Sequence, residues 1–199
     1  MFQYNTIINT TEAVFKDKVS RFISYAFPFQ NEEQLKIHLK ALRDIHTKAR
    51  HFCYAYKIGI DSNNFRTSDD GEPGGSAGKS IFNAILSQSL SNVLVVVVRY
   101  FGGTLLGVRG LINAYKTAAT LALKVAEIET IYLKDIWILK FSFENLNDLM
   151  KITKEFNLVI IKQEYHPTCS FEIEINKNET TEILAKFEKL RAFEITLKV

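Results

Sequence analysis

The sequence predicts an α+β protein made of two domains. Its 199 residues, 47% hydrophobic and 24% charged, lie in the ordinary globular range and are enough for two separate cores. The last third of the chain alternates strand-like and helix-like segments in the order βαββαβ, whereas the first part mixes strands, amphipathic helices and two glycine-rich loops. We therefore place the domains at residues 1–130 and 134–199, with the boundary between Ala126 and Lys134.

Hydrophobic spacing defines the elements of the first domain. The expected order is a strand at Arg21–Pro28, a helix at Glu32–His46, a strand at Phe52–Ile60, a long exposed loop at Asp61–Gly78, a helix over Ile81–Leu90, a buried strand at Val93–Val98 and a helix that ends at Val125. In the first helix, Leu35, Leu39, Leu42 and Ile45 recur at helical spacing and should face the core.

The second domain follows from the same two periodicities. We expect a strand at Lys134–Phe143, a helix at Asn145–Asn157, a hairpin of Leu158–Tyr165 and Thr168–Ile175 that turns at His166 and Pro167, a helix at Glu179–Leu190 and a strand through Phe193, Ile195 and Leu197. This βαββαβ order is that of a ferredoxin-like domain.

Composition excludes several classes of protein. The longest apolar run, Val93–Val98, is far shorter than the roughly 20 residues of a membrane-spanning helix, so no membrane association is expected. Residues Met1–Val14 lack the basic start and apolar block of a secretion signal. The two cysteines, Cys53 and Cys169, are too few for a disulfide framework. We therefore expect a cytoplasmic protein.

The charge of the chain is weakly informative. The first 133 residues carry 15 Lys and Arg against 11 Asp and Glu, and the remainder carries 10 against 11. This mild basic bias of the first domain is compatible with an anionic partner such as nucleic acid, although it is weaker than the basic stripe of a dedicated nucleic-acid binder.

The first candidate site is an acidic segment inside the long loop. Asp69, Asp70 and Glu72 place three carboxylates within four residues, a pattern that could hold a divalent cation. The alternative interpretation is a solvated acidic loop.

The same loop ends in glycines that open a helix. Gly75, Gly78 and Lys79 could bind a phosphate through backbone N–H groups at the helix start. A P-loop is excluded, because that motif requires glycine where this chain has Pro73. Equally, the glycines could serve only to turn the chain.

The second candidate site follows the most hydrophobic strand. Its residues are Arg99, Tyr100, Gly102, Gly103 and Arg109. Arginine beside an aromatic ring could hold a phosphate while a base stacks, as in single-stranded nucleic-acid sites. Tyr100 and Phe101 could instead cap the core; we favour the core interpretation for Phe101 and binding for Arg99 and Arg109.

A third candidate lies on the expected strand at Phe52–Ile60 and the residues before it. His51 and Cys53 share one face of this strand, but a thiol nucleophile or a zinc site would need further partners. We therefore expect no metal and no cofactor, with Cys53 in the core and His51 bonded to the acidic loop at Asp69 or Asp70.

The chain resembles the IMPACT/YigZ family in three segments. Ala49–Tyr56, Asp69–Gly78 and Val96–Tyr115 resemble the family patterns A-x-H-x-C-x-A-Y, D-D-G-E-P-x-G-T-A-G and V-V-x-R-Y-F-G-G-x-x-L-G-x-x-G-L-x-x-A-Y, with Ser76 where the second pattern has Thr. The resemblance implies a first domain of the ribosomal protein S5 domain 2-like fold and a ferredoxin-like second domain resembling the last domain of elongation factor G. It also implies a role in translation regulation, with RNA or the ribosome as partner.

Three functions remain open. The favoured one is a non-enzymatic protein that binds RNA or the ribosome through the glycine-rich loops and Arg99. The alternative is a metal-dependent enzyme that processes phosphate esters with Asp69, Asp70 and Glu72, with His51 as proton carrier. In the third, the second domain binds a protein partner through an exposed Trp137.

Overall fold

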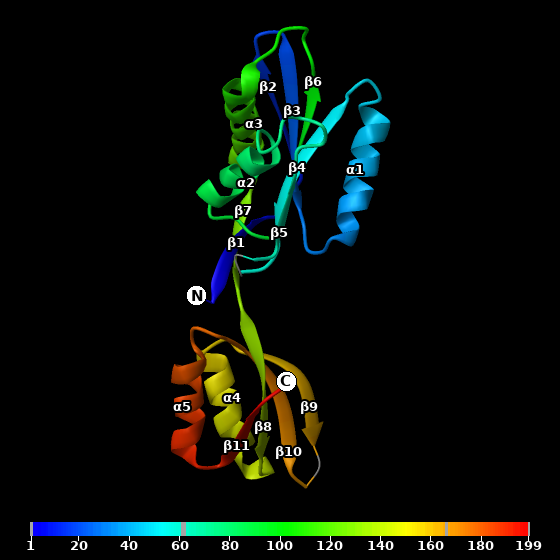
Figure 1. The fold of residues 1–199 in the computed structure, drawn as a ribbon. Helices are drawn as coiled ribbons and strands as arrows, with labels where there is room; N and C mark the ends of the chain where they lie inside the picture. Colours follow the sequence, from blue (N-terminus) through cyan, green and yellow to red (C-terminus); the bar gives the residue numbers. More distant parts are fainter. Residues whose placement is uncertain (1, 61–62, 166, 199) are drawn as a thin grey trace. The chain divides into compact units, whose positions relative to one another are not determined.

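The computed structural model describes residues 2–60, 63–165 and 167–198, so the predicted residues Asp61 and His166 lie outside the described part. It divides into two compact units: Tyr4–Ile131, and the described residues of Met1–Gln3 and Tyr132–Val199. Both contain helices and strands (Figure 1). Within the described residues, no helix combines the length and apolar character needed to cross a bilayer.

The first unit is built on a five-stranded sheet with the order β2-β3-β6-β4-β5. The strands are β2 (Thr11–Asp17), β3 (Ser20–Pro28), β4 (His51–Lys57), β5 (Phe65–Ser68) and β6 (Val93–Tyr100). Every neighbouring pair is antiparallel. A further pair, β1 (Gln3–Ile7) and β7 (Ile128–Tyr132), forms a separate two-stranded sheet.

Helices cover both faces of the five-stranded sheet (Figure 1). They are α1 (Glu33–Ile45), α2 (Gly78–Ser87) and α3 (Gly107–Lys124). The run of valines on β6 divides between two cores, because successive side chains of a strand point to opposite faces. Val93, Val95 and Val97 pack with α2 and α3, whereas Leu94 and Val96 pack with α1.

The second unit is a four-stranded sheet with the order β11-β8-β10-β9. Its elements are β8 (Lys134–Phe141), a short 3₁₀ turn at Phe143–Asn145, α4 (Leu146–Glu155), β9 (Val159–Tyr165), β10 (Cys169–Asn176), α5 (Thr180–Leu190) and β11 (Phe193–Leu197). The predicted βαββαβ order and the hairpin of β9 and β10 are confirmed. Phe171, Ile173 and Ile175 alternate into the core as expected.

The structure corrects several predictions. Strand β5 lies inside the segment that we expected to be a long exposed loop, and β1, β2 and β7 were not predicted. Ile45 is not a core residue, because α1 ends there and leaves its side chain 69% exposed. Trp137 is not exposed: it packs partly buried against the core of the second unit, which removes the feature that suggested a protein-binding surface.

Candidate functional site

The register of two strands brings His51 and Arg99 together. Strands β4 and β6 pair antiparallel with His51 opposite Arg99, and both residues fall on the face of the sheet that α2 and α3 cover. Residues directly opposite each other on one face have Cβ atoms about 5 Å apart. The second and third candidate segments of the sequence therefore meet at the end of the sheet.

Glu72 connects the acidic loop to this point. Its carboxylate forms an ion pair with Arg99 at 2.6 Å, and both side chains are almost fully buried. The Tyr115 hydroxyl donates to the same Glu72 oxygen at 2.7 Å. The guanidinium also lies 5.5 Å from the centre of the Phe22 ring and 5.4 Å from that of Phe101. These contacts hold Arg99 in one position.

Asp69 occupies the start of α2. Its carboxylate accepts hydrogen bonds from the backbone N–H groups of Gly75, Ala77 and Gly78 at 2.8–2.9 Å. Burial alone raises the pKa of Asp69, but these three backbone bonds outweigh it and lower the pKa below its usual value. The N–H groups expected to hold a phosphate are therefore already bound to a carboxylate, and the anion site at Gly75 and Gly78 is wrong.

Asp70 fixes the start of β4. Its carboxylate accepts from the Phe52 N–H at 2.7 Å and pairs at 3.4 Å with Arg43. Its backbone carbonyl accepts from His51 Nδ1 at 2.9 Å, which confirms the expected bond between His51 and the acidic loop. Since a carbonyl only accepts, Nδ1 carries the proton of neutral His51 and Nε2 is left as the acceptor.

The three carboxylates do not converge on one point. Each has its own internal partners, and among the described residues no group of three or more His, Cys, Asp or Glu side chains is placed to hold a metal ion. Cys53 is a buried free thiol that donates to the Asp69 carbonyl, and burial raises its pKa. It is a core residue, as predicted, and not an activated nucleophile.

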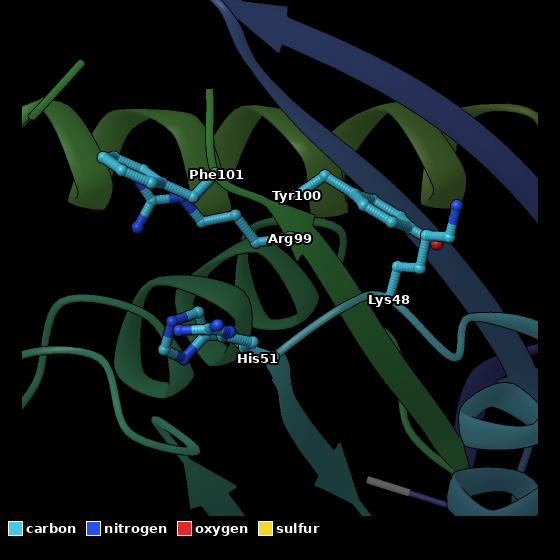
Figure 2. Close-up of a pocket in the computed structure, with 6 residues that line it drawn as sticks. Lys48, His51, Arg99, Tyr100 and Phe101 are labelled. Atoms are coloured by element: carbon cyan, nitrogen blue, oxygen red, sulfur yellow. The ribbon is translucent and has the colours of Figure 1, made fainter. Parts of the chain in front are cut away.

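A pocket opens where β4 begins and β6 ends (Figure 2). It has a volume of about 350 Å³ and is lined by Lys48, Arg50, His51, Arg99, Tyr100 and Phe101. None of the described lining residues carries a carboxylate. In Figure 2, Arg99 and Phe101 lie at one end of the pocket, and Tyr100 and Lys48 lie at the other. Cationic side chains around a pocket whose described lining carries no carboxylate favour an anion.

Phe101 is the aromatic wall of this pocket. Its side chain is 54% exposed, so the core interpretation is wrong for this residue.

Gly102 lies shortly after the end of β6. The strand ends at Tyr100, which packs on the face of the sheet that α1 covers, and the backbone then continues to Gly102. A Cβ atom at Gly102 would lie 2.1 Å from the Val19 backbone, so this glycine serves a close approach of two chain segments.

Other predicted site residues lie outside the pocket. Gly75, Gly78, Lys79, Gly102, Gly103 and Arg109 are not among its lining residues. Lys79 and Arg109 are exposed residues in the first turns of α2 and α3. The sequence reasoning overlooked Lys48 and Arg50 as site residues. The basic run from Lys48 to His51, which leads into the start of β4, could have indicated them.

A chain of hydrogen bonds that sequence reasoning also missed begins at Tyr100, one of the lining residues. The Tyr100 hydroxyl bonds to His46 Nδ1 at 2.9 Å, and His46 Nε2 bonds to the Tyr25 hydroxyl at 2.8 Å. Glu12 on β2 lies directly opposite Tyr25 on β3. Burial and Glu12 together raise the pKa of Tyr25 to about 12, and burial lowers the pKa of His46.

Known proteins share this architecture and sequence. Residues 18–123 match the family described as the Impact N-terminal domain. An IMPACT family member of Haemophilus influenzae is 32% identical over 161 residues, which cover 79% of this chain and 78% of that protein. The IMPACT family member YigZ of Escherichia coli is 30% identical over 171 residues, covering 85% and 84% of the two chains.

Solved structures give a similar result. A crystal structure of a hypothetical protein superposes with a TM-score of 0.70 at 27% identity and covers 100% of this chain and 98% of its own. The two-domain translational regulator Yih1 matches with a TM-score of 0.38 at 27% identity over 59% of this chain and 47% of its own, too slight a likeness for inference. On the family match over residues 18–123 and the two sequence relatives, the chain belongs to the IMPACT family.

Proposed function

We propose that this protein is a non-enzymatic, translation-associated regulator that binds RNA, free or in the ribosome, at the pocket of its first domain. The observation that carries the proposal is the pocket lining: Lys48, Arg50 and Arg99 supply cationic nitrogen donors, and none of the described lining residues carries a carboxylate. Phosphate groups are the anions that such a lining suits.

The exposed ring of Phe101 supports a nucleic acid rather than a small anion. An aromatic side chain beside phosphate-binding cations is the combination by which single-stranded nucleic acids are held, with bases stacked on the ring. The contact of Phe101 with the fixed Arg99 guanidinium positions both groups before a ligand arrives. The metal-dependent alternative lacks such support, because its three carboxylates are bonded to separate internal partners.

The domain identities belong to the same proposal. We infer that residues 1–130 form an S5 domain 2-like domain and residues 134–199 a ferredoxin-like domain resembling the last domain of elongation factor G. The βαββαβ order and the strand order of the second unit support the latter. The role in translation and the cytoplasmic location follow the family resemblance, and the two free, buried cysteines suit a reduced compartment.

The test is binding of a short single-stranded RNA, followed by fluorescence anisotropy at about 50 and 200 mM salt. The variant is the double substitution Lys48→Ala with Arg50→Ala, because both side chains are exposed and their loss leaves the core intact. Arg99→Ala is unsuitable, since it would leave Glu72 charged and buried.

We expect the double variant to bind at least tenfold more weakly and to reduce the salt dependence by about two phosphate contacts. The matched control, Lys79→Ala with Lys124→Ala, removes the same charge from exposed positions outside the pocket and should bind nearly as wild type. Equal losses in both variants, or no binding of RNA by wild type at low salt, would refute the proposal. Co-sedimentation with ribosomes extends the same comparison to the assembled particle.

A further inference from the structure

One stretch of the first domain contains no acidic residue. Residues 73–126 include neither Asp nor Glu, although a stretch of this length would contain about six at the chain's average of 22 in 199. The stretch includes α2 and α3, which lie together on one face of the sheet (Figure 1). Lys79 on α2 and Arg109, Lys116 and Lys124 on α3 are exposed. The charged side chains of these two helices are therefore all positive.

The start of α3 also exposes a row of aliphatic side chains. Leu105, Val108 and Ile112 are 81%, 52% and 40% exposed. Residues three and four positions apart share one face of a helix, so Val108 and Ile112 lie in line, with Leu105 just before the first turn. Arg109 follows Val108, and Lys116 lies one turn beyond Ile112 on the same face. Single exposed aliphatic residues are ordinary, but a row of them forms a continuous apolar surface.

This surface belongs to a fixed part of the fold. The opposite face of α3 is buried through residues such as Leu111 and Tyr115. The hairpin of β2 and β3 holds the segment before the helix, because Lys18 Nζ donates to the Leu105 carbonyl at 3.3 Å. The acidic residue of that hairpin, Asp17, is partly buried. A partner therefore meets a surface that needs no ordering before it binds.

Helix α1 provides a contrast within the same domain. It also exposes two aliphatic residues, Ile37 and Ile45, at 67% and 69%. Its charges, however, are of both signs, since the exposed residues Glu33 and Asp44 accompany its lysines. Exposed aliphatic side chains alone do not distinguish α3. The distinguishing feature is their combination with charges of a single sign.

We propose that this face of α3 binds an acidic, amphipathic segment of a partner protein. Aliphatic side chains of the segment pack on Leu105, Val108 and Ile112, and its carboxylates pair with Arg109 and Lys116. An amphipathic helix that lays its apolar face on such a surface is a common mode of peptide recognition, and complementary charge sets its orientation. The inference concerns a second surface and does not depend on RNA binding at the pocket.

The aliphatic row favours a protein over a nucleic acid. Positive charge alone suits both, because phosphates and carboxylates are both anions. The sugar–phosphate backbone has no apolar side chains to bury, whereas single-stranded nucleic acids gain their non-electrostatic affinity by stacking bases on aromatic rings. Leu105, Val108 and Ile112 offer no ring. Burial of their apolar surface requires apolar side chains on the partner.

The test uses a designed helical peptide of about 18 residues with leucines on one face and glutamates along both flanks. Two matched peptides replace either the glutamates by lysine or the leucines by serine. Wild type should bind the acidic amphipathic peptide at least tenfold more tightly than either of the others. Amide chemical shifts of the labelled protein should change mainly between residues 105 and 116. Equal binding of the three peptides, or shift changes confined to other elements, would overturn the inference.

Two double variants separate the apolar and the charged contributions. The apolar variant, Val108→Ser with Ile112→Ser, should bind the acidic peptide about tenfold more weakly or worse, because two aliphatic contacts are lost. The charge variant, Arg109→Ala with Lys116→Ala, should bind it about threefold more weakly or worse and with less dependence on salt. All four side chains are exposed, so circular dichroism should show both variants folded.

Helix α1 supplies the matched controls. Ile37→Ser with Ile45→Ser removes two equally exposed aliphatic side chains, and Lys36→Ala with Lys40→Ala removes two exposed positive charges. Both should bind the acidic peptide as wild type does. A loss in these controls equal to that in the α3 variants would show that binding is not specific to α3, and the inference would be wrong.

Other occupants of this face would be recognised by the same variants. If the charge variant weakened RNA binding as much as the loss of Lys48 and Arg50 does, the face would belong to an RNA track. Loss of binding to phosphatidylcholine–phosphatidylserine vesicles in the apolar variant would assign it to a lipid surface, and loss of a wild-type dimer in sedimentation would assign it to a second copy. Each of these results would overturn the inference. Peptide binding in a protein that binds no RNA would refute the proposed function and leave this inference standing.

Discussion

Arg99 and Glu72 form a buried ion pair at 2.6 Å, with side chains only 7% and 4% exposed. Each charge is left without water and depends on the other for compensation. The pair joins the end of β6 to the acidic loop, and the Tyr115 hydroxyl from α3 completes the bonding of Glu72. This ion pair therefore joins two of the sequence segments that identify the family. It lies next to the pocket and stabilises the fold; it is not part of a metal site.

Removal of either partner should destabilise the first domain strongly. We expect Glu72→Gln or Arg99→Ala to lower the free energy of unfolding by about 3–5 kcal/mol, because the remaining charge or donor stays buried without its partner. The double variant Arg99→Met with Glu72→Leu should lose much less than the sum of the two single changes. Urea denaturation followed by far-UV circular dichroism measures all four proteins.

An exposed pair in the same domain is the control. Arg43 and Asp70 lie 3.4 Å apart with side chains 53% and 29% exposed. Arg43→Ala should lower the free energy of unfolding by no more than about 1 kcal/mol. A similar loss in Arg43→Ala and Arg99→Ala would contradict the importance of the buried pair.

Asp69 should make the stability of the first domain depend on pH. Its pKa is lower in the folded protein than in the unfolded chain, so its contribution is fully present above the unfolded value of about 3.9 and is lost as the pH falls through the folded value. Asp69→Asn should lower the free energy of unfolding by about 1–3 kcal/mol at pH 7. The difference from wild type should shrink as the pH falls toward 2.

Chemical denaturation across this pH range measures the difference. The control, Asp44→Asn, changes an exposed carboxylate on α1 and should leave the pH dependence as in wild type. A difference between Asp69→Asn and wild type that stays constant with pH would show that the charge of Asp69 does not act through the bonds to Gly75, Ala77 and Gly78.

Gly102 should tolerate no side chain. A Cβ atom would lie 2.1 Å from the backbone of Val19, and backbone atoms cannot move aside as a flexible side chain can. We expect Gly102→Ala to lower the free energy of unfolding by about 1–3 kcal/mol. Gly74→Ala, where a Cβ would meet no atom within 4 Å, should change it by less than about 0.5 kcal/mol. Thermal unfolding of the two variants decides between a steric role and a merely flexible loop.

Periodicity predicted the elements that have one clearly buried face. Six apolar residues in a row on β6 and the alternation of Phe171, Ile173 and Ile175 on β10 are examples. The strands β1 and β7 escaped prediction, because their short segments are largely exposed or half-buried and show no alternation. Ile45 was misplaced because helical spacing does not show where the helix ends.

The candidate site was predicted in its parts and not in its arrangement. The motif around Arg99 and His51 indicated residues that do line the pocket, and the bond of His51 to Asp70 was expected. The bonds by which Asp69 caps α2 were not predicted. Nor was the connection of Tyr25 to Tyr100 through His46, because these two partners lie 21 and 54 positions away from the histidine in the sequence. Local sequence patterns contain no information on such distant contacts.

Phe101 should matter for binding and little for stability. Its ring is 54% exposed and contacts the Arg99 guanidinium, so its removal leaves no cavity in the core. We expect Phe101→Ala to change the free energy of unfolding by less than about 1 kcal/mol. RNA affinity should fall about fivefold or more, the effect of losing one stacked base. Phe101→Tyr, which keeps an aromatic face, should bind nearly as wild type, whereas Phe101→Leu should not. Equal RNA affinity of the leucine and tyrosine variants would mean that the ring supplies apolar contact alone, and that stacking is not how this pocket holds a base.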